Sequence, residues 1–232
     1  MTSAPTTVDL AAAWGTSPQP WALGQDWTRL PTRQQVVALT IDAGANADAV
    51  GSMLATLRAK HVTATFFLTG AWARTYPAKV AAIEADGHVI GNHSDTHAHL
   101  PALSAAEVRG QLSRADAAIS HQIGRTSRPL FRFPYGDVSA AALTTVNDAG
   151  YVAVRWTVDT LGWMGRSGQV PMTADTVITR VLDRLQPGEI VLMHTGSNPD
   201  DGSMLDAEAL PRLIDALRAR GYGFTTLACL TR

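Results

Sequence analysis

The sequence contains a single cysteine, Cys229, and this scarcity removes whole classes of structure. One thiol cannot form a disulfide within the chain, and it cannot supply the thiolate cluster of a structural zinc site. Because Cys229 stands late in the last predicted element, we interpret it as a buried apolar residue. The fold must therefore be held by a packed core rather than by sulfur cross-links.

Charge is also sparse, and the two signs are balanced. Charged residues make up 17% of the 232 residues, and the formal net charge is -1. Without a long run of one sign, nothing favours a nucleic-acid partner. The apolar runs, such as Val36–Leu39, are far too short to span a bilayer. We therefore expect a soluble protein without a membrane span, and its 46% hydrophobic content suffices for one sizeable core.

The first residues lack a basic segment followed by an apolar one, so the sequence shows no signal peptide. A secreted domain without its leader would begin in this way, and so would a cytoplasmic protein. Residues 1–34 are rich in Pro, Thr and Trp but have no periodicity. We expect them to wrap the domain edge as an irregular segment, ahead of one catalytic barrel over residues 35–232.

From residue 35 onward, short β-rich runs alternate with helical stretches. Strands are predicted over Val36–Asp42, Thr63–Leu68, His88–Asn92, Leu130–Phe133, Val152–Thr157, Ile190–His194 and Gly223–Leu227. Helices are predicted near 46–59, 77–86, 104–123, 138–148, 174–186 and 206–220. Such alternation indicates parallel strands joined by right-handed crossovers. Seven units suit an α/β barrel, although an open doubly wound sheet would give the same pattern.

Polar residues follow the C-terminal ends of the predicted strands, namely Asp42, His93, Arg132, Asp159 and His194. In parallel α/β folds ligands bind at that edge, because the loops converge there. Each residue alone has a structural explanation, but five on one rim are difficult to explain by packing. We therefore predict that they meet at one cleft.

Two histidines four residues apart, His93 and His97, would face one metal ion if their segment forms a helical turn. Spacing alone favours two surface histidines in a loop, and their place after a strand shifts the balance toward ligands. Asp42, just before Gly44, is a candidate general base or an ordinary turn residue. His194 ends an apolar strand, where it would serve as a general acid or as a buried structural histidine.

Two further segments have both a functional and a structural interpretation. Arg132 would bind a carboxylate, and the turn at Pro134 and Tyr135 would aim a backbone N–H at an oxyanion; an ordinary strand exit is the alternative. Trp156 and Trp163 flank Asp159, which suits either a sugar-stacking wall or core packing.

In chain order, five segments resemble the motifs of the polysaccharide deacetylase (NodB-homology) family. The family shows T-F-D-D-G, H-[ST]-x-x-H, R-x-P-Y, D-x-x-D-W and L-x-H. The matching segments are Thr40–Gly44, His93–His97, Arg132–Tyr135, Asp159–Trp163 and Leu192–His194. Ala64–Gly70 also resembles the second strand of the family, and the similarity covers about residues 35 to 227. Five ordered motifs make the resemblance specific.

The resemblance implies an α/β fold of the distorted (β/α)7 barrel type. It also implies a hydrolase that removes N-acetyl groups from a glycan such as peptidoglycan or a chitin-like polymer. By similarity the catalytic residues are Asp42 as general base, Arg132 orienting it, the Tyr135 N–H at the oxyanion, His194 as general acid, and Asp159. Trp163 and Tyr135 would bind substrate, and His93 and His97 would hold a divalent metal, usually zinc. A secreted or cell-wall monomer is expected, with a cytoplasmic location left open.

Two departures from the motifs bear on activity. Ala43 stands where the family has its third metal ligand, so we expect weakly bound zinc, with Asp42, Asn46, Asp48 or water filling the position. Gly162 replaces the carboxylate that tunes the acid histidine, and Asp159 is the nearest carboxylate left to orient His194. The alternative function is therefore a carbohydrate-binding relative with weakened or lost catalysis.

Overall fold

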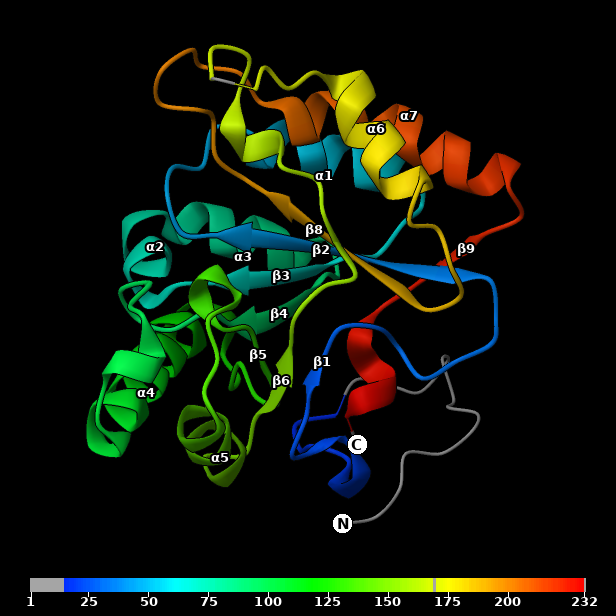
Figure 1. Cartoon of the computed structure of the whole chain (residues 1–232). Coiled ribbons are helices and arrows are strands. Elements are labelled where there is room, and N and C mark those ends of the chain that lie inside the picture. Colours follow the sequence, from blue (N-terminus) through cyan, green and yellow to red (C-terminus); the bar gives the residue numbers. More distant parts are fainter. Residues whose placement is uncertain (1–14, 169, 232) are drawn as a thin grey trace.

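A computed structural model describes residues 15–168 and 170–231 (Figure 1). Its centre is one parallel sheet with the strand order β1-β6-β5-β4-β3-β2-β8-β7, and β9 pairs with β2. The strands are β1 (Asp26–Trp27), β2 (Val36–Ala43), β3 (Thr65–Leu68), β4 (Val89–Asn92), β5 (Leu130–Phe131), β6 (Val152–Val154), β7 (Val158–Asp159), β8 (Glu189–His194) and β9 (Gly223–Thr225).

Helices cover the outside of the curled sheet (Figure 1). They are α1 (Val50–Ala59), α2 (Gly70–Thr75), α3 (Pro77–Ala85), α4 (Ala105–Ile123), α5 (Ala140–Asp148), α6 (Ala174–Leu182) and α7 (Leu205–Ala219). α7 contacts both α1 and α6, whereas α4 contacts α2, α3 and α5. In the described part of the chain, no helix is both long enough and apolar enough to cross a membrane.

All seven predicted strands are present, with ends that differ by a few residues. Among the strands and α-helices, β7 and α2 were not predicted, and Thr69 caps α2 by accepting the Trp72 N–H at 3.1 Å. A third, β1, corrects the expectation of an irregular segment over residues 1–34, because Asp26 pairs in parallel register with Ala153 of β6. Residues 1–14 lie outside the described part of the chain.

The passage between β6 and β7 decides between a barrel and an open sheet. The Arg155 N–H donates to the Trp27 carbonyl of β1 at 2.8 Å, and the Thr157 N–H donates to the Ile190 carbonyl of β8, also at 2.8 Å. One extended segment therefore bridges the two sides of the sheet. The predicted distorted α/β barrel is confirmed.

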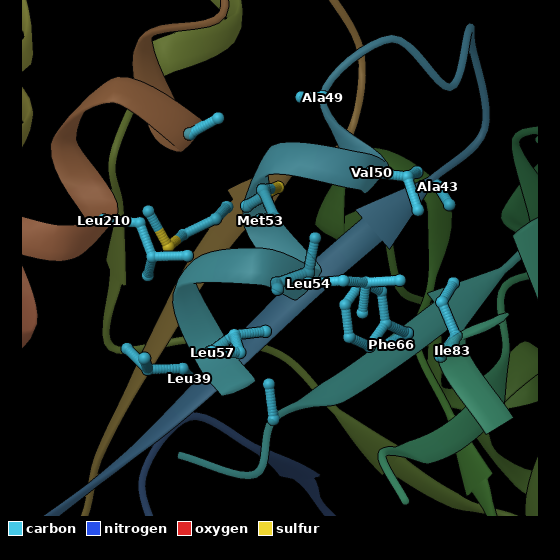
Figure 2. Packing of buried hydrophobic residues seen from close by; sticks show 14 of the residues in the cluster. Leu39, Ala43, Ala49, Val50, Met53, Leu54, Leu57, Phe66, Ile83 and Leu210 are labelled. Carbon is cyan, nitrogen blue, oxygen red and sulfur yellow. The ribbon is translucent and has the colours of Figure 1, made fainter. Parts of the chain in front are cut away.

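Side chains of β2 alternate between the two faces of the sheet. Leu39, Ile41 and Ala43 belong to the apolar cluster between the sheet and the helices α1 and α7. Figure 2 shows Met53 and Leu57 of α1 in this cluster. Ala38, on the other face, belongs to the cluster inside the barrel. The same alternation directs Thr40 and Asp42 inward, so Asp42 lies at the C-terminal mouth of the barrel.

The close approach of β4 to its neighbours gives a test of this packing. A Cβ at Gly91 would lie 2.8 Å from two ring carbons of Phe67 and 3.1 Å from the Leu130 carbonyl oxygen. We expect Gly91→Ala to lower the free energy of unfolding by about 1–3 kcal/mol through overpacking. Urea unfolding followed by circular dichroism measures this loss.

Gly51 provides the matched control, because an added Cβ there has nothing within 4 Å and the residue lies in the exposed first turn of α1. Gly51→Ala is expected to leave stability unchanged or raise it by up to about 1 kcal/mol, since alanine favours the helix. Equal losses from the two substitutions would contradict the packing described for β4.

Candidate active site

A cleft of about 470 Å³ opens at the C-terminal mouth of the barrel. Its lining consists of Asp42, Gly44, Ala45, His93, His97, Tyr135, Trp156, Asp159, Trp163, Leu192 and His194. The predicted convergence of strand-end residues on one cleft is confirmed for these side chains. Arg132, which was predicted with them, is fully buried and lies behind Asp42 rather than in the lining.

The guanidinium of Arg132 makes four hydrogen bonds inside the barrel. It donates from Nη1 to Asp42 Oδ1 at 2.7 Å, and from Nη2 to Thr40 Oγ1 at 2.8 Å. Its other acceptors are the carbonyl oxygens of Val154, at 3.1 Å from Nε, and Arg155, at 2.8 Å from Nη2. Since Arg132 is held from several sides, the Asp42 carboxylate that it binds is held in one orientation.

The charge of Arg132 also keeps Asp42 ionised. Burial alone would raise the pKa of this carboxyl, but the positive charge of Arg132, helped by that of protonated His194, outweighs burial and holds the pKa below its ordinary value. A buried carboxylate that stays ionised at the mouth of a cleft is suited to accept a proton from a bound water molecule.

His93 shares this network. Its Nδ1 lies 2.9 Å from the carbonyl oxygen of Arg132, and its Nε2 lies 3.3 Å from Asp42 Oδ2. Burial lowers the pKa of His93, so the ring is neutral and Nδ1–H donates to the carbonyl. The Nε2 lone pair then points toward Asp42 Oδ2 at the cleft, and this tautomer is the one of a metal-binding histidine with a backbone partner.

His97 stands beside it, with the two ring centroids 4.8 Å apart. Burial is the main cause that lowers the pKa of His97 to about 4, and the neighbouring His93 is the second. The rings meet although the segment is not the helical turn that the spacing suggested. Ser94 and His97 instead adopt left-handed backbone conformations, with φ of 65° and 57°, and Ser94 Oγ accepts the His97 N–H at 3.1 Å.

Sequence reasoning missed Gln111, which fixes this segment from α4. Its Oε1 accepts the N–H groups of Asp95 and Thr96 at 2.8 and 2.9 Å, and its Nε2 donates to Thr96 Oγ1 at 2.9 Å. No local pattern marks Gln111, because its partners are more than a dozen residues earlier in the chain.

His194 has a different carboxylate partner from the one expected. The motifs left Asp159 as the nearest candidate, but its oxygens accept the Leu161 N–H at 2.8 Å and Trp163 Nε1–H at 3.4 Å. Asp206 of α7 instead accepts the His194 backbone N–H at 2.8 Å, and its Oδ2 lies 3.7 Å from His194 Nδ1. The tertiary packing of α7 against β8 brings this carboxylate in.

The environment of His194 favours its protonated form. Burial lowers the pKa of the imidazole, but the carboxylates of Asp206, Asp42 and Asp159 together raise it above its ordinary value. Burial raises the pKa of Asp159 itself. His194 can therefore carry a proton to the cleft near neutral pH.

Aromatic side chains border the cleft. Tyr135 is 59% exposed and Trp163 50% exposed, and Trp156 contributes to the same lining. The Tyr135 ring stacks on His99 with centroids 4.0 Å apart, and its backbone is left-handed with φ of 60°. Exposed aromatic faces at a cleft rim are suited to stack on sugar rings.

Comparisons with known proteins agree on one family. The family profile described as polysaccharide deacetylase matches residues 29–154. A chitooligosaccharide deacetylase of Azorhizobium caulinodans is 34% identical, over 88% of this chain and 98% of the relative. A peptidoglycan-N-acetylglucosamine deacetylase of Bacillus cereus is 32% identical, over 85% of this chain and 68% of the relative.

Solved structures add a comparison that bears on activity. The crystal structure of a peptidoglycan N-acetylglucosamine deacetylase superposes with a TM-score of 0.79 and 31% identity, over 88% of this chain and 91% of that one. A CE4 family pseudoenzyme from Bacillus anthracis has a TM-score of 0.76 and 28% identity, over 85% and 65%. A mutant of that pseudoenzyme is described as having restored enzymatic activity.

The buried pair of Arg132 and Asp42 gives a prediction about stability. We expect Arg132→Met to lower the free energy of unfolding at pH 7 by about 3–5 kcal/mol, because a buried carboxylate loses its partner. Arg58→Met is the control, since the Arg58 side chain is 66% exposed in its 2.8 Å pair with Asp86, and such pairs contribute less than about 1 kcal/mol.

The pH dependence of this loss has a definite sign. The pKa of Asp42 is below the ordinary 3.8 in the folded wild type, so its contribution is present above pH 3.8 and is lost as pH falls through the folded pKa. In Arg132→Met, protonation of Asp42 relieves the unpaired charge, so the difference from wild type should narrow on acidification. Urea unfolding at several pH values measures the difference in free energy of unfolding between the wild type and Arg132→Met. A difference that does not change with pH would contradict the role of charge.

Proposed function

The chain belongs to the polysaccharide deacetylase family, a family of hydrolases, and we propose that it removes N-acetyl groups from an amino-sugar polymer. Chitooligosaccharide and peptidoglycan N-acetylglucosamine are the substrates named for its relatives, and we propose a peptidoglycan or chitin-like glycan here. Such a substrate implies work outside the cell or at the cell wall, which we include in the proposal.

One observation carries the proposal, namely that Asp42, bound by Arg132, lies beside His194, which faces the Asp206 carboxylate, at the mouth of one cleft. The two residues are register partners on the adjacent strands β2 and β8. The pKa of Asp42 is lowered and that of His194 is raised, so near neutral pH one is a base and the other an acid. Two titratable groups whose pKa values are separated in this way indicate the base and the acid of a hydrolytic reaction.

Amide hydrolysis needs both groups. Asp42 accepts a proton from water as the water oxygen attacks the acetyl carbonyl carbon. When the carbon–nitrogen bond breaks, the proton of His194 goes to the departing amine, and the products are acetate and a free amino sugar. Arg132 keeps the Asp42 carboxylate in place during the attack. We assign the Tyr135 N–H, in its left-handed turn, to the oxygen that becomes negative.

Deacetylases of this family depend on a metal, and this chain offers part of a metal site. Two neutral imidazoles with centroids 4.8 Å apart fit one ion, and we propose zinc held by His93 and His97. A bound divalent ion would polarise the acetyl carbonyl and lower the pKa of water. Within residues 15–168 and 170–231, however, no group of three histidine, cysteine or acidic side chains is placed to hold an ion.

The side chains considered as a third ligand are engaged elsewhere. Asn46 Oδ1 accepts the Ser197 N–H at 2.8 Å, and Asp48 Oδ2 accepts the Ser197 hydroxyl at 2.6 Å. Asp42 is bound by Arg132. Ala43 is fully buried in the apolar cluster, next to Val50 in Figure 2. The residues therefore fit an ion held by two imidazoles, and we propose that it is bound weakly.

This incomplete ligand set favours a second candidate function. A relative that keeps the aromatic cleft and binds glycan without hydrolysing it would need Tyr135 and Trp163 but no tightly held metal. The structural similarity to a CE4 family pseudoenzyme supports this alternative. Measuring both acetate release and glycan binding distinguishes the two candidates.

The acid gives the direct test of hydrolysis. The wild type, supplied with zinc, is expected to release acetate from N-acetylated chitooligosaccharides or peptidoglycan fragments, and His194→Ala should reduce kcat by about 10²-fold or more. His121→Ala, at an exposed position on α4, is the matched control and should retain full activity. Unchanged release from His194→Ala would remove this residue from the mechanism. Glycan binding without release by the wild type would favour the second candidate.

Restoring the family's carboxylate tests the metal site. Ala43→Asp buries a carboxylate in an apolar cluster, so without metal its melting temperature should fall below that of the wild type. Zinc held by His93 and His97 would compensate that charge, and the variant should bind zinc at least about tenfold tighter, or roughly 1.4 kcal/mol. Competition with a chromophoric chelator measures the affinity. Equal or weaker binding would mean that residue 43 does not reach the histidines.

A further inference from the structure

The absence of a side chain at Gly162 makes room for a specific group. A Cβ on Gly162 would lie 2.4 Å from Asp206 Oδ1, 2.6 Å from its Cγ and 2.9 Å from its Oδ2. Gly162 is not among the glycines with positive φ, so its backbone does not require glycine for conformational reasons. The glycine is needed for space, and the Asp206 carboxylate occupies the volume that a side chain at 162 would fill.

The position of Asp206 is suited to holding a negative charge beside His194. Asp206 is 3% exposed and lies in the first turn of α7, where the helix dipole stabilises an anion. Its Oδ2 accepts the His194 backbone N–H at 2.8 Å and lies 3.7 Å from Nδ1 of the same residue. Among the described residues, Asp206 Oδ1 and His194 Nδ1 are both buried without a hydrogen-bond partner.

The other carboxylates that face His194 are committed elsewhere. Asp42 on β2 is bound by Arg132, and Asp159 on β7 accepts bonds from Leu161 and the Trp163 indole. The further charged or titratable residues in the cleft lining are His93 and His97 on the loop after β4, and Tyr135. Asp206 is therefore the carboxylate whose charge is directed mainly at His194.

We propose that Asp206 is the positioning residue of His194, and that α7 supplies from behind the carboxylate that the fourth motif of this family supplies from position 162. A charge beside Nδ1 fixes the proton there and turns Nε2–H toward the cleft, where the leaving amine would take it. The inference rests on the proposed function for its meaning in catalysis, but the contact between Asp206 and His194 is testable without activity.

The first experiment follows the protonation of His194 by nitrogen–proton correlation NMR of the full chain without added metal. In the wild type, the neutral ring is expected to carry its proton on Nδ1. Asp206→Asn keeps the shape and an acceptor oxygen but removes the charge, so the midpoint of the His194 titration should fall by about one pH unit or more. Asp175→Asn is the matched control, because Asp175 is 78% exposed and paired with Arg212 on the surface.

The second experiment moves the carboxylate back to position 162. Gly162→Asp alone should lower the melting temperature, because two groups compete for one volume. Combining Gly162→Asp with Asp206→Gly removes the conflict, and the pair should recover both the melting temperature and the His194 midpoint. With an N-acetylated chitooligosaccharide as substrate, the alkaline limb of kcat/KM should shift to lower pH in Asp206→Asn and return in the double variant.

The outcomes separate this inference from the proposed function. A wild-type His194 with the neutral proton on Nε2, or a midpoint that Asp206→Asn does not move, would overturn the role of Asp206 even if acetate is released. If Asp206→Asn does not fold, the wild-type tautomer still decides the role of Asp206. A folded double variant with a midpoint well below wild type would overturn the claim that Asp206 supplies the carboxylate that the family motif has at position 162. Absence of acetate release by the wild type would instead overturn the proposed function and leave the NMR result valid.

Discussion

The buried ion pair between Arg132 and Asp42 is the interaction on which the rest of the site depends. A guanidinium with no solvent contact can persist only if its donors and its charge are satisfied inside the protein. Arg132 meets this requirement through Thr40 and Asp42 of β2 and through the carbonyl oxygens of Val154 and Arg155. The same residue, through its own carbonyl, fixes the His93 ring. Arg132 thus connects β2 to Val154 and Arg155; its side chain orients the proposed base and its backbone carbonyl orients a proposed ligand.

The acid half of the cleft is organised by a helix instead of by the strand-end motifs. His194 ends β8, and the first turn of α7 brings the Asp206 carboxylate to its backbone N–H and toward its ring. The glycine at 162 leaves room for that carboxylate. Base and acid are therefore supported by different parts of the chain, although they are neighbours across one strand pair.

The two departures from the family motifs have different structural consequences. The missing carboxylate at Gly162 is matched by Asp206, which occupies its volume, whereas Ala43 is a methyl group packed into the apolar cluster. The proposed acid, His194, thus keeps a neighbouring carboxylate, whereas the proposed metal site lacks an anionic ligand. This difference is the physical basis for the two candidate functions. Hydrolysis needs both the proton donor and the metal, whereas glycan binding needs neither of them.

Local sequence patterns determined the elements and the edge at which the site lies. Alternating strand and helix patterns indicated the α/β fold, and polar residues after the strands placed Asp42, His93 and His194 at one mouth. These features depend on neighbours within a few residues, so they can be read from the sequence. Only the tertiary structure decided the bridging segment after β6, the left-handed turn that brings His97 to His93, and the partnership of His194 with Asp206. Each of these depends on which distant segments share a volume, and the space left by Gly162 acquires its meaning only when α7 fills it.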